Sequence, residues 1–318
     1  MDLGSRNNLW QDKSVFVTGA TGFVGQWLTR TLLQQGAHPV LLVRDGVPDM
    51  WQFAKTCNIV RGDVCNQPLM ERILNEYDVQ VIFHLAALSN VTFANQHPSN
   101  SYLTNVMGTV SLLEAARRVK PEARIAVASS DKAYGDCDSL PYKESTPLFG
   151  RNPYDCSKSC QDLIAQSYQL TQGLRVSISR CGNIYGGGDL TWNRLIPNTI
   201  RRLIRGNTPV VYGAGSETRD LFYVEDTVNA YLRLIECDAS GPYNFSTGEE
   251  LTVKSVIETI CRLMDKPVHY DTLNMLKGEI SYQVLDSTKA RTELGWEPLY
   301  TLEEGLKRTI VWYREYLK

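Results

Sequence analysis

The segment SVFVTGATGFVG, residues 14–25, decides how the chain folds. Its first five residues are a short apolar run typical of a buried strand, and the run leads into the pattern G-x-x-G-x-x-G. Glycines at this spacing allow a tight turn, close approach of the backbone to a pyrophosphate, and close packing of the helix that follows. The N-terminus of that helix attracts phosphate charge. The segment therefore predicts a dinucleotide-binding loop, formed by Gly19, Thr21, Gly22, Phe23, Val24 and Gly25.

Short β-branched runs alternate with longer amphipathic segments over the first 180 residues. The expected strands are 14–18, 40–43, 79–83, 124–128 and 175–180, and the expected helices are 26–35, 68–77, 101–119 and 154–171. Strands that are buried on both faces and alternate with helices pair in parallel through right-handed crossovers. This rhythm predicts an α/β fold with a doubly wound parallel sheet, the Rossmann fold.

The rhythm changes after about residue 181, where glycines and prolines break the chain into loops around a helix near 192–205. We expect residues 1–180 to form the dinucleotide-binding lobe, with 219–246 returning to it. Residues 181–218 and 247–318 are expected to form a smaller α/β lobe that binds the substrate. Ligands of such sheets bind beyond the carboxyl ends of the strands.

The composition excludes several classes of protein. The chain has 318 residues, 43% of them hydrophobic, and a formal charge of −2 that offers no long-range field to nucleic acid or to an anionic membrane. The eight cysteines form no C-x-x-C pair and no zinc-like cluster, so we expect reduced thiols in a cytoplasmic protein without a metal site. No stretch is typical of a signal peptide or a membrane span.

Tyr154 and Lys158 are four residues apart within the expected helix 154–171 and therefore share one face. A tyrosine with its ordinary pKa of about 10 is a poor base near neutral pH. The ammonium of Lys158 can lower that pKa, and a positively charged nicotinamide ring helps. The pair predicts a redox site in which Tyr154 is the base.

Arg44 occupies the first position after the second expected strand, where an acidic residue that binds the ribose of NAD is usual. A guanidinium suits the 2′-phosphate of NADP, whereas Asp45, one residue later, could serve NAD. The cofactor is therefore NADP or NAD, with a slight preference for NADP.

Three further motifs extend the pattern: RGDV at 61–64, HLAA at 84–87 and NVMGT at 105–109. Together with the glycine loop and Tyr154-x-x-x-Lys158, they make the chain resemble the extended short-chain dehydrogenases/reductases that modify nucleotide sugars. The resemblance implies a homodimer formed through the helices near 101–119 and 154–171. It also implies that the cofactor is bordered by Asp63, Val64, Leu85, Ala86, Ala87 and Asn105.

Within this family, SDK at 130–132 and GNIYGGGD at 182–189 look most like CDP-glucose 4,6-dehydratases. Related dehydratases carry an acidic residue in place of Lys132, and epimerases usually carry small residues at both 131 and 132. The stretch TRDLFYVED at 218–226 resembles the general epimerase and dehydratase pattern instead, and Ala20 replaces a usual histidine. These departures leave the nucleotide base and the sugar open.

The resemblance implies a role for each catalytic candidate in a 4,6-dehydration. Tyr154 would take the proton of the C4 hydroxyl, Ser130 would orient that hydroxyl, and Lys158 would hold the phenolate and the nicotinamide ribose. Asp131 would donate to the departing C6 oxygen, for which burial must keep its carboxyl protonated. Lys132 is either the base for the C5 proton, with a strongly lowered pKa, or a charge that stabilises the carbanion.

The substrate-binding candidates are Ser89, Asn183, Arg194, Arg219 and Glu279. We expect Arg219 to contact a phosphate. Arg194 is either a second phosphate contact or a surface residue, and Glu279 either binds ribose hydroxyls or is a solvated loop acid.

Two other functions remain open at this point. A 4-epimerase or 4-keto reductase would use only Ser130, Tyr154 and Lys158, with Asp131 and Lys132 as a surface ion pair. A regulatory protein that only senses the cofactor would be expected to have lost the Tyr154 and Lys158 pair, which is present here.

Overall fold

The computed structural model of the chain describes residues 9–46, 55–137, 140–273 and 282–318. The chain divides into two compact units. Unit 1 consists of Met1–Gly135, Pro147–Arg180 and Val228–Tyr243, and unit 2 of Asp136–Thr146, Cys181–Thr227 and Asn244–Lys318. The segment that rejoins unit 1 thus begins at Val228, somewhat later than residue 219.

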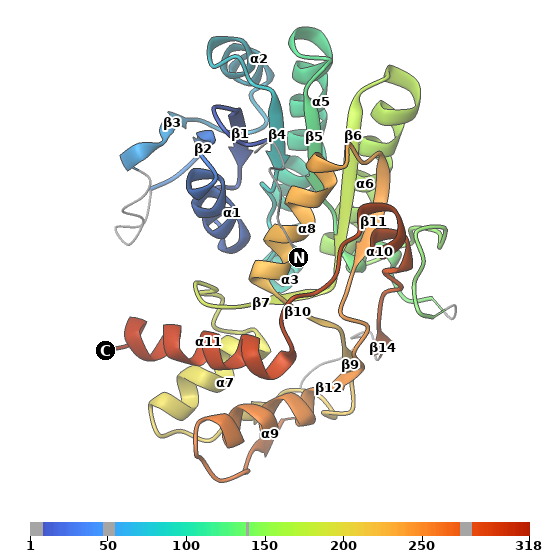
Figure 1. Ribbon diagram of the computed structural model, residues 1–318. Helices are drawn as coiled ribbons and strands as arrows, with labels where there is room; N and C mark the ends of the chain where they lie inside the picture. The colour runs from blue at the N-terminus through green and yellow to red at the C-terminus, as the bar shows by residue number, and fades with distance from the viewer. Residues whose placement is uncertain (1–8, 47–54, 138–139, 274–281) are drawn as a thin grey trace. The chain divides into compact units, whose positions relative to one another are not determined.

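The main sheet has seven strands in the order β11-β6-β5-β4-β1-β2-β3 (Figure 1). Its strands are β1 (Ser14–Thr18), β2 (His38–Val43), β3 (Asn58–Arg61), β4 (Val81–His84), β5 (Arg124–Ala128), β6 (Arg175–Cys181) and β11 (Gly241–Phe245). Strand β1 pairs in parallel with β2 on one side and with β4 on the other, so the direction of winding reverses between β1 and β4. The prediction of a doubly wound parallel sheet is confirmed, although β3 was not expected.

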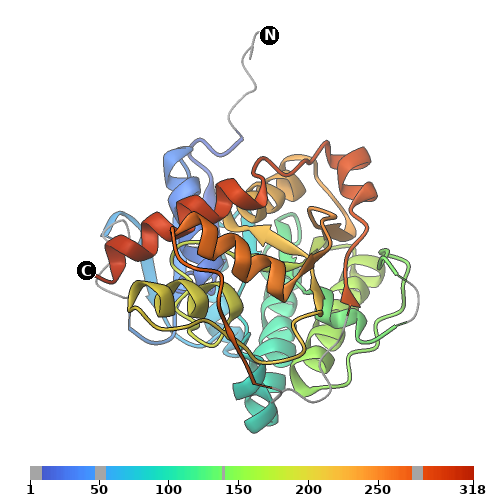
Figure 2. The same cartoon turned by 90° about the horizontal axis from the view of Figure 1, so that it is seen from below.

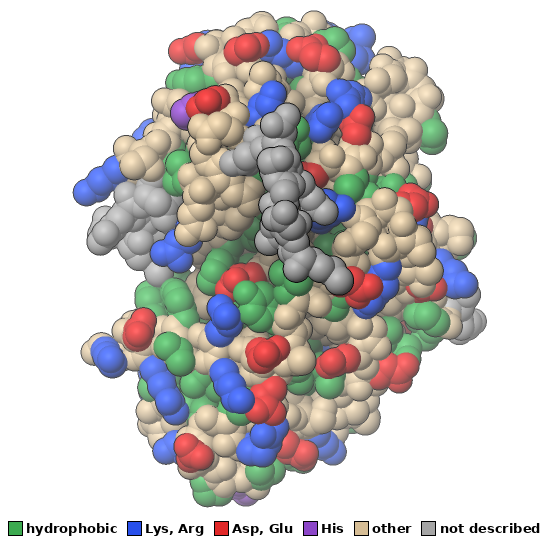
Figure 3. All heavy atoms as spheres, viewed as in Figure 1, with side chains coloured by type: hydrophobic (Ala, Val, Ile, Leu, Met, Phe, Trp, Pro, Cys, Tyr) green, Lys and Arg blue, Asp and Glu red, His purple; other side chains and the backbone are tan. Residues whose placement is uncertain are grey.

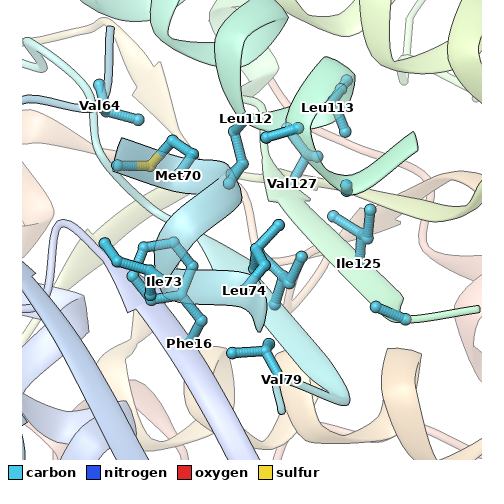
Figure 4. Close-up of a cluster of buried hydrophobic side chains, with 14 of the residues drawn as sticks. Phe16, Val64, Met70, Ile73, Leu74, Val79, Leu112, Leu113, Ile125 and Val127 are labelled. Carbon is cyan, nitrogen blue, oxygen red and sulfur yellow. The ribbon is translucent and has the colours of Figure 1, made fainter. Parts of the chain in front are cut away.

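Helices cover the sheet because each of them buries one apolar stripe. They include α1 (Phe23–Gln34), α2 (Gln67–Glu76), α5 (Gly108–Val119), α6 (Pro153–Gln172) and α8 (Val224–Glu236), while the short helix α3 (Val91–Gln96) packs against α6. Figure 4 shows part of the core, in which Met70 and Ile73 of α2 and Leu112 of α5 lie close to Phe16 of β1 and Ile125 of β5. Burial of each such side chain stabilises the fold by about 1.5–3 kcal/mol.

The expected single helix at 101–119 was wrong in its first part. Helix α4 (Pro98–Ser101) leads into a π-helical segment, η2 (Tyr102–Met107), and only then into α5. The π segment contains Asn105, whose amide accepts from the Leu88 backbone N–H and donates to Ser157 Oγ, both at 2.8 Å. These two hydrogen bonds give a physical reason for the wider turn at this point, a device common at functional positions.

Helix α6 has clear signals at both ends. Pro153 occupies its first turn, where the missing N–H is not needed. Gly173 ends the helix in the left-handed conformation, with φ of 70°, which glycine adopts without strain. The expected stop at Gly173 is therefore confirmed, and the helix is long enough to carry Tyr154, Lys158 and Asp162 on successive turns.

Unit 2 contains helices and short strands. Its helices are α7 (Leu195–Ile204), α9 (Val253–Leu263), α10 (Thr288–Leu294) and α11 (Leu302–Tyr316), and Figure 2 shows α7, α9 and α11 packed side by side. Its strand pairs include β7 (Asn183–Tyr185) with β10 (Leu221–Tyr223), and β9 (Thr218–Arg219) between β12 (Leu251–Thr252) and β14 (Tyr282–Gln283). A two-stranded ladder joins β8 (Val210–Val211) to β13 (Asp271–Thr272).

Basic and acidic side chains are interspersed on the face shown in Figure 3, in keeping with the small formal charge. None of the helices within the described ranges is long and apolar enough to cross a bilayer.

Candidate active site

The glycine loop after β1 is closely packed against the start of the next loop. A Cβ at Gly19, whose φ is +69°, would lie 2.6 Å from the Ala86 nitrogen, and a Cβ at Gly25 would lie 2.3 Å from the Gly19 oxygen. Helix α1 begins with Gly22 as an N-cap that provides no side-chain acceptor, and its first turn holds no acidic residue. A closely packed backbone at a helix N-terminus that lacks an acidic residue fits a pyrophosphate. The residues present therefore fit NAD(P).

Arg44 follows β2 and lies exposed beside its neighbour. Its Nε donates to Asp45 Oδ2 at 3.0 Å, and Arg61 donates to the Asp45 carbonyl at 3.1 Å. Arg44 and Asp45 thus form an ion pair. The guanidinium that would suit NADP and the carboxylate that would suit NAD lie side by side.

The other expected cofactor residues lie at the ends of β3 and β4. Asp63 is exposed, and its Oδ1 accepts from the Cys65 backbone N–H at 2.9 Å. Val64 is buried beneath Gly108, where an added Cβ would lie 2.6 Å from Val64 Cγ1. The half-buried residues Leu85, Ala86 and Ala87 follow β4 directly.

Asn105 forms hydrogen bonds to protein groups on both sides. It is fully buried, and both ends of its amide bind protein groups, Leu88 on one side and Ser157 on the other. Ser157 in turn donates to the Tyr154 carbonyl at 2.7 Å. Asn105 therefore holds the loop after β4 against α6, and its contact with the cofactor stays a prediction.

Lys158 lies in the interior of unit 1 with 2% of its surface exposed. Its Nζ donates to the Ala128 carbonyl and to Gln161 Oε1, both at 2.8 Å. Burial lowers the pKa of Lys158 to about 7, and the charge of Asp162 opposes this shift. Tyr154 is also buried and lies one turn earlier on α6. The structure thus brings the predicted pair together on one helix.

Ser130, Asp131 and Lys132 begin the 3₁₀ helix η3 (Asp131–Tyr134). Ser130 is its N-cap and accepts from the Lys132 backbone N–H at 3.2 Å, while the Ser130 hydroxyl donates to Asp131 Oδ1 at 2.9 Å. The Asp131 side chain is almost completely enclosed, at 3% exposure. This is the burial that a protonated carboxyl acid requires.

Helix α6 holds η3 in place beside the Tyr154 and Lys158 pair. Ser159 Oγ donates to the Ala133 carbonyl at 2.7 Å. Burial raises the pKa of Asp155, the positive charge of Lys132 lowers it, and the negative charge of Asp131 raises it again. Asp155 is therefore a further ionisable group of this site, and nothing in the spacing of the sequence pointed to it.

A buried ion pair also supports η3. Arg180 at the end of β6 binds Asp162 of α6 through Nε and Nη2, each at 2.8 Å, and donates from Nη1 to Tyr134 Oη at 2.8 Å. Sequence reasoning missed this group. The available signals were an arginine near the end of the strand RVSISRC and an acid four residues after Lys158.

The substrate candidates of unit 2 have different surroundings. The Asn183 side-chain nitrogen is buried and has no hydrogen-bond partner among the described residues. Arg219 is buried on β9 and donates to the Thr218 carbonyl at 3.0 Å. Arg194, by contrast, is the N-cap of α7 and pairs with the buried Asp189 at 3.1 Å. Arg194 thus forms an ion pair inside unit 2, and its contact with a phosphate stays a prediction.

The remaining two candidates stay predictions. Ser89 is exposed and lies in the loop after β4 in unit 1. Glu279 lies outside the described residues.

A comparison with known protein families matches the model described as GDP-mannose 4,6 dehydratase over residues 16–309. The chain belongs to this family. It is thus a member of the extended short-chain dehydrogenases/reductases that act on sugar nucleotides, as the resemblance of its motifs indicated, and it is an enzyme.

Proteins that are similar to the chain are named for more than one reaction. CDP-glucose 4,6-dehydratase of Salmonella typhimurium is 29% identical over 98% of this chain and 93% of its own length. A solved dTDP-glucose 4,6-dehydratase of Bacillus anthracis in complex with NAD is 30% identical, with a TM-score of 0.85, and the match covers 95% of this chain and 97% of that one. A UDP-glucose 4-epimerase of Thermotoga maritima with UDP-glucose is 26% identical, with a TM-score of 0.90, covering 96% and 100%.

Proposed function

We propose that this enzyme is a sugar-nucleotide 4,6-dehydratase that converts an NDP-hexose to the NDP-4-keto-6-deoxyhexose. The observation that carries the proposal is the position of the enclosed Asp131 and of Lys132 on η3, a segment held by Ser159 of the same helix that carries Tyr154 and Lys158. A redox pair alone serves any member of the family. An acid and a lysine beside it are what a dehydration needs in addition.

The first step is oxidation at C4 of the sugar. Tyr154 takes the proton of the C4 hydroxyl, which Ser130 orients. Lys158 stabilises the phenolate, because an ammonium next to a phenolate favours the ionised form. Bound NAD(P) supplies the hydride acceptor for C4 and later the hydride donor for C6, so that it ends the cycle unchanged.

The second step is loss of water across C5 and C6, which the C4 ketone makes possible by acidifying the C5 proton. Asp131 donates a proton to the departing C6 oxygen. The C5 proton passes either to Lys132 acting as a neutral base, or to another group while a charged Lys132 stabilises the carbanion.

The nucleotide and the hexose are the finer part of the proposal. The motifs SDK and GNIYGGGD favour a CDP-glucose-like substrate, and the identity to the Salmonella enzyme is in keeping with it. We propose Asn183 and Arg219 as substrate contacts. The unpartnered buried amide of Asn183 supports the first, because such a donor costs free energy until a ligand binds it.

The cofactor is NAD or NADP. The slight preference for NADP that Arg44 suggested finds no support in the Bacillus enzyme, which is described with NAD. In this chain the Asp45 carboxylate beside Arg44 would repel a 2′-phosphate. Thermal unfolding with each dinucleotide separates the two, since the better ligand raises the midpoint at the lower concentration.

The function is tested by incubating the enzyme with CDP-, dTDP-, GDP- and UDP-hexoses and following the products by mass spectrometry. A product that has lost one water, formed without added reductant, supports the proposal. An unchanged mass with inverted C4 would identify a 4-epimerase instead, and a gain of two hydrogens that requires NADPH would identify a 4-keto reductase.

The epimerase is the second candidate because the Thermotoga epimerase has the same fold at a TM-score of 0.90. An epimerase would use Ser130, Tyr154 and Lys158, and Asp131 would have no role in the reaction. A cytoplasmic location and a homodimer remain predictions.

A further inference from the structure

His84 at the end of β4 belongs to a hydrogen-bond chain through the interior of unit 1. Its Nδ1 lies 2.8 Å from Thr18 Oγ1, and its Nε2 lies 2.8 Å from Thr109 Oγ1. Gln161 Nε2 donates to the same Thr109 oxygen at 2.9 Å, and Lys158 Nζ donates to Gln161 Oε1 at 2.8 Å. All five residues are buried. Side chains alone therefore connect the last residue of β1 to the catalytic lysine.

The direction of each hydrogen bond follows from counting protons. Thr109 has one hydroxyl proton and donates it to the Asn105 carbonyl at 2.7 Å. Its oxygen must then accept from both His84 Nε2 and Gln161 Nε2. His84 is thus the neutral Nε2–H tautomer, and its Nδ1 accepts from the Thr18 hydroxyl. With its nitrogen engaged by Thr109, the Gln161 amide has only one orientation, which points its oxygen at the lysine.

The electrostatics keep this arrangement over a wide range of pH. Burial, together with the positive charge of Lys158, lowers the pKa of His84 to about 3. The charges that act on the two ends of the chain are thus Lys158 itself and Asp162, which opposes the effect of burial on Lys158. The lowered pKa and the hydrogen-bond geometry thus agree on a neutral His84 that donates from Nε2.

The far end of the chain is fixed at the dinucleotide-binding loop. The Ala86 backbone N–H donates to Thr18 Oγ1 at 3.2 Å. Gly19 follows Thr18 and lies against Ala86, since an added Cβ there would be 2.6 Å from the Ala86 nitrogen. The chain therefore joins the two loops expected to border the cofactor to α6.

We propose that His84 is a positioning residue of the redox step: acting through Thr109 and Gln161, it holds an acceptor against Lys158 and so keeps that lysine charged and in place. An ammonium has three N–H donors, and Ala128 and Gln161 receive two of them, which leaves the third for the phenolate or the ribose. The proposal rests on the redox step of the proposed function and holds for a dehydratase or an epimerase.

The test measures the pKa of Lys158 in the cofactor-free enzyme, by NMR of protein labelled with ¹³C at lysine Cε. The variant Lys158→Met assigns the resonance. Thr109→Val keeps the shape of the side chain and removes the shared oxygen. We expect it to lower the Lys158 pKa by about one pH unit, roughly the worth of one charge-assisted hydrogen bond. Gln161→Glu is expected to raise the pKa above the wild-type value, because it places a carboxylate at the same position.

His84→Phe should shift the Lys158 pKa in the same direction as Thr109→Val. The double variant His84→Phe/Thr109→Val should shift the Lys158 pKa no further than the larger of the two single changes, because the residues act as one unit. Thr109→Ser keeps the hydroxyl and should restore the wild-type value. The matched control is Thr309→Val in unit 2, where a buried threonine also donates to the carbonyl four residues earlier at 2.7 Å. That variant should leave the Lys158 pKa unchanged.

The proposal would be overturned if the folded Thr109→Val variant had the same Lys158 pKa as the wild type. It would also be overturned if the two shifts in the Lys158 pKa simply added in the double variant. Retention of the fold is checked by circular dichroism and thermal unfolding. This readout needs neither substrate nor cofactor. If the sugar-nucleotide screen fails while the titrations behave as expected, the proposed function is wrong and the positioning role stands.

Discussion

Arg180 and Asp162 form a bidentate ion pair inside unit 1, with both side chains at 1% exposure or less and both hydrogen bonds at 2.8 Å. Burial lowers the pKa of Arg180, and the hydrogen bonds and charge of Asp162 raise it by more, so the net direction is upward. Because Arg180 also binds Tyr134, the pair connects β6 and α6 to the short helix that carries Asp131.

Removal of one partner of this pair should destabilise the enzyme strongly. For Arg180→Met we expect a loss of about 3–5 kcal/mol in the free energy of unfolding, because Asp162 is left as a buried charge without its partner. The double variant Arg180→Met/Asp162→Leu should recover part of that loss. Urea unfolding measures both. Arg262→Ala breaks the exposed ion pair with Glu303 and is the control, expected to cost less than about 1 kcal/mol. An equally small effect of Arg180→Met would contradict the prediction.

Asp131→Asn should separate the two halves of the reaction. An amide of the same shape cannot donate a proton to the C6 oxygen as a carboxylic acid does, so water loss should slow by about 100-fold or more. Oxidation at C4 should continue, because Tyr154 and Lys158 are unchanged. Stopped-flow absorbance of the reduced nicotinamide should therefore show an intermediate that accumulates. Tyr154→Phe is the counterpart and should abolish that signal. If Asp131→Asn slowed both steps equally, Asp131 would have no specific role in the elimination.

Lys158 should make the stability of the cofactor-free enzyme depend on pH. Its pKa is about 7 in the native state against an ordinary 10.5, so between these values the unfolded chain binds more protons at this site. Native stability therefore rises with pH between these two values. The destabilisation caused by burying a charged Lys158 is fully present below about pH 7. Lys158→Met has no ionisable group at this position and therefore lacks this pH dependence. The difference in unfolding free energy between variant and wild type should fall by up to several kcal/mol as the pH rises, at about 1.4 kcal/mol per pKa unit. A difference independent of pH would mean that Lys158 is not desolvated as described.

The expected homodimer can be tested on the exposed apolar residues of the two helical segments named for it. Leu103 of η2 and Leu163 of α6 are 55% and 54% exposed. Burying such side chains in an interface would contribute about 1.5–3 kcal/mol each. Leu103→Glu/Leu163→Glu should therefore shift the enzyme toward monomer in sedimentation velocity. Val311→Glu on α11, 54% exposed in unit 2, is the control and should have no effect. If the wild-type enzyme were monomeric at all concentrations, the prediction of a homodimer would be wrong.

Local patterns predicted much of the fold and half of the site. The strand and glycine loop at 14–25 and the pair Tyr154 and Lys158 depend on residues a few positions apart, so helix and strand periods suffice to place them. The expected helix 154–171 agrees closely with α6, Pro153–Gln172. The expected helix 101–119 failed at η2, because the π turn coincides with contacts that Asn105 makes to residues 17 and 52 positions away.

The sequence by itself determined the glycine loop after the first strand, the position of Tyr154 and Lys158 on one helix face, and the presence of an acid and a lysine before Ala133. Only the tertiary structure decided their chemical state. Lys158 loses most of its solvent because strands and helices from distant parts of the chain enclose it, and its acceptor Gln161 is oriented by a threonine 52 residues away. Burial and hydrogen-bond partners depend on packing between elements, which the spacing of residues along one element does not contain.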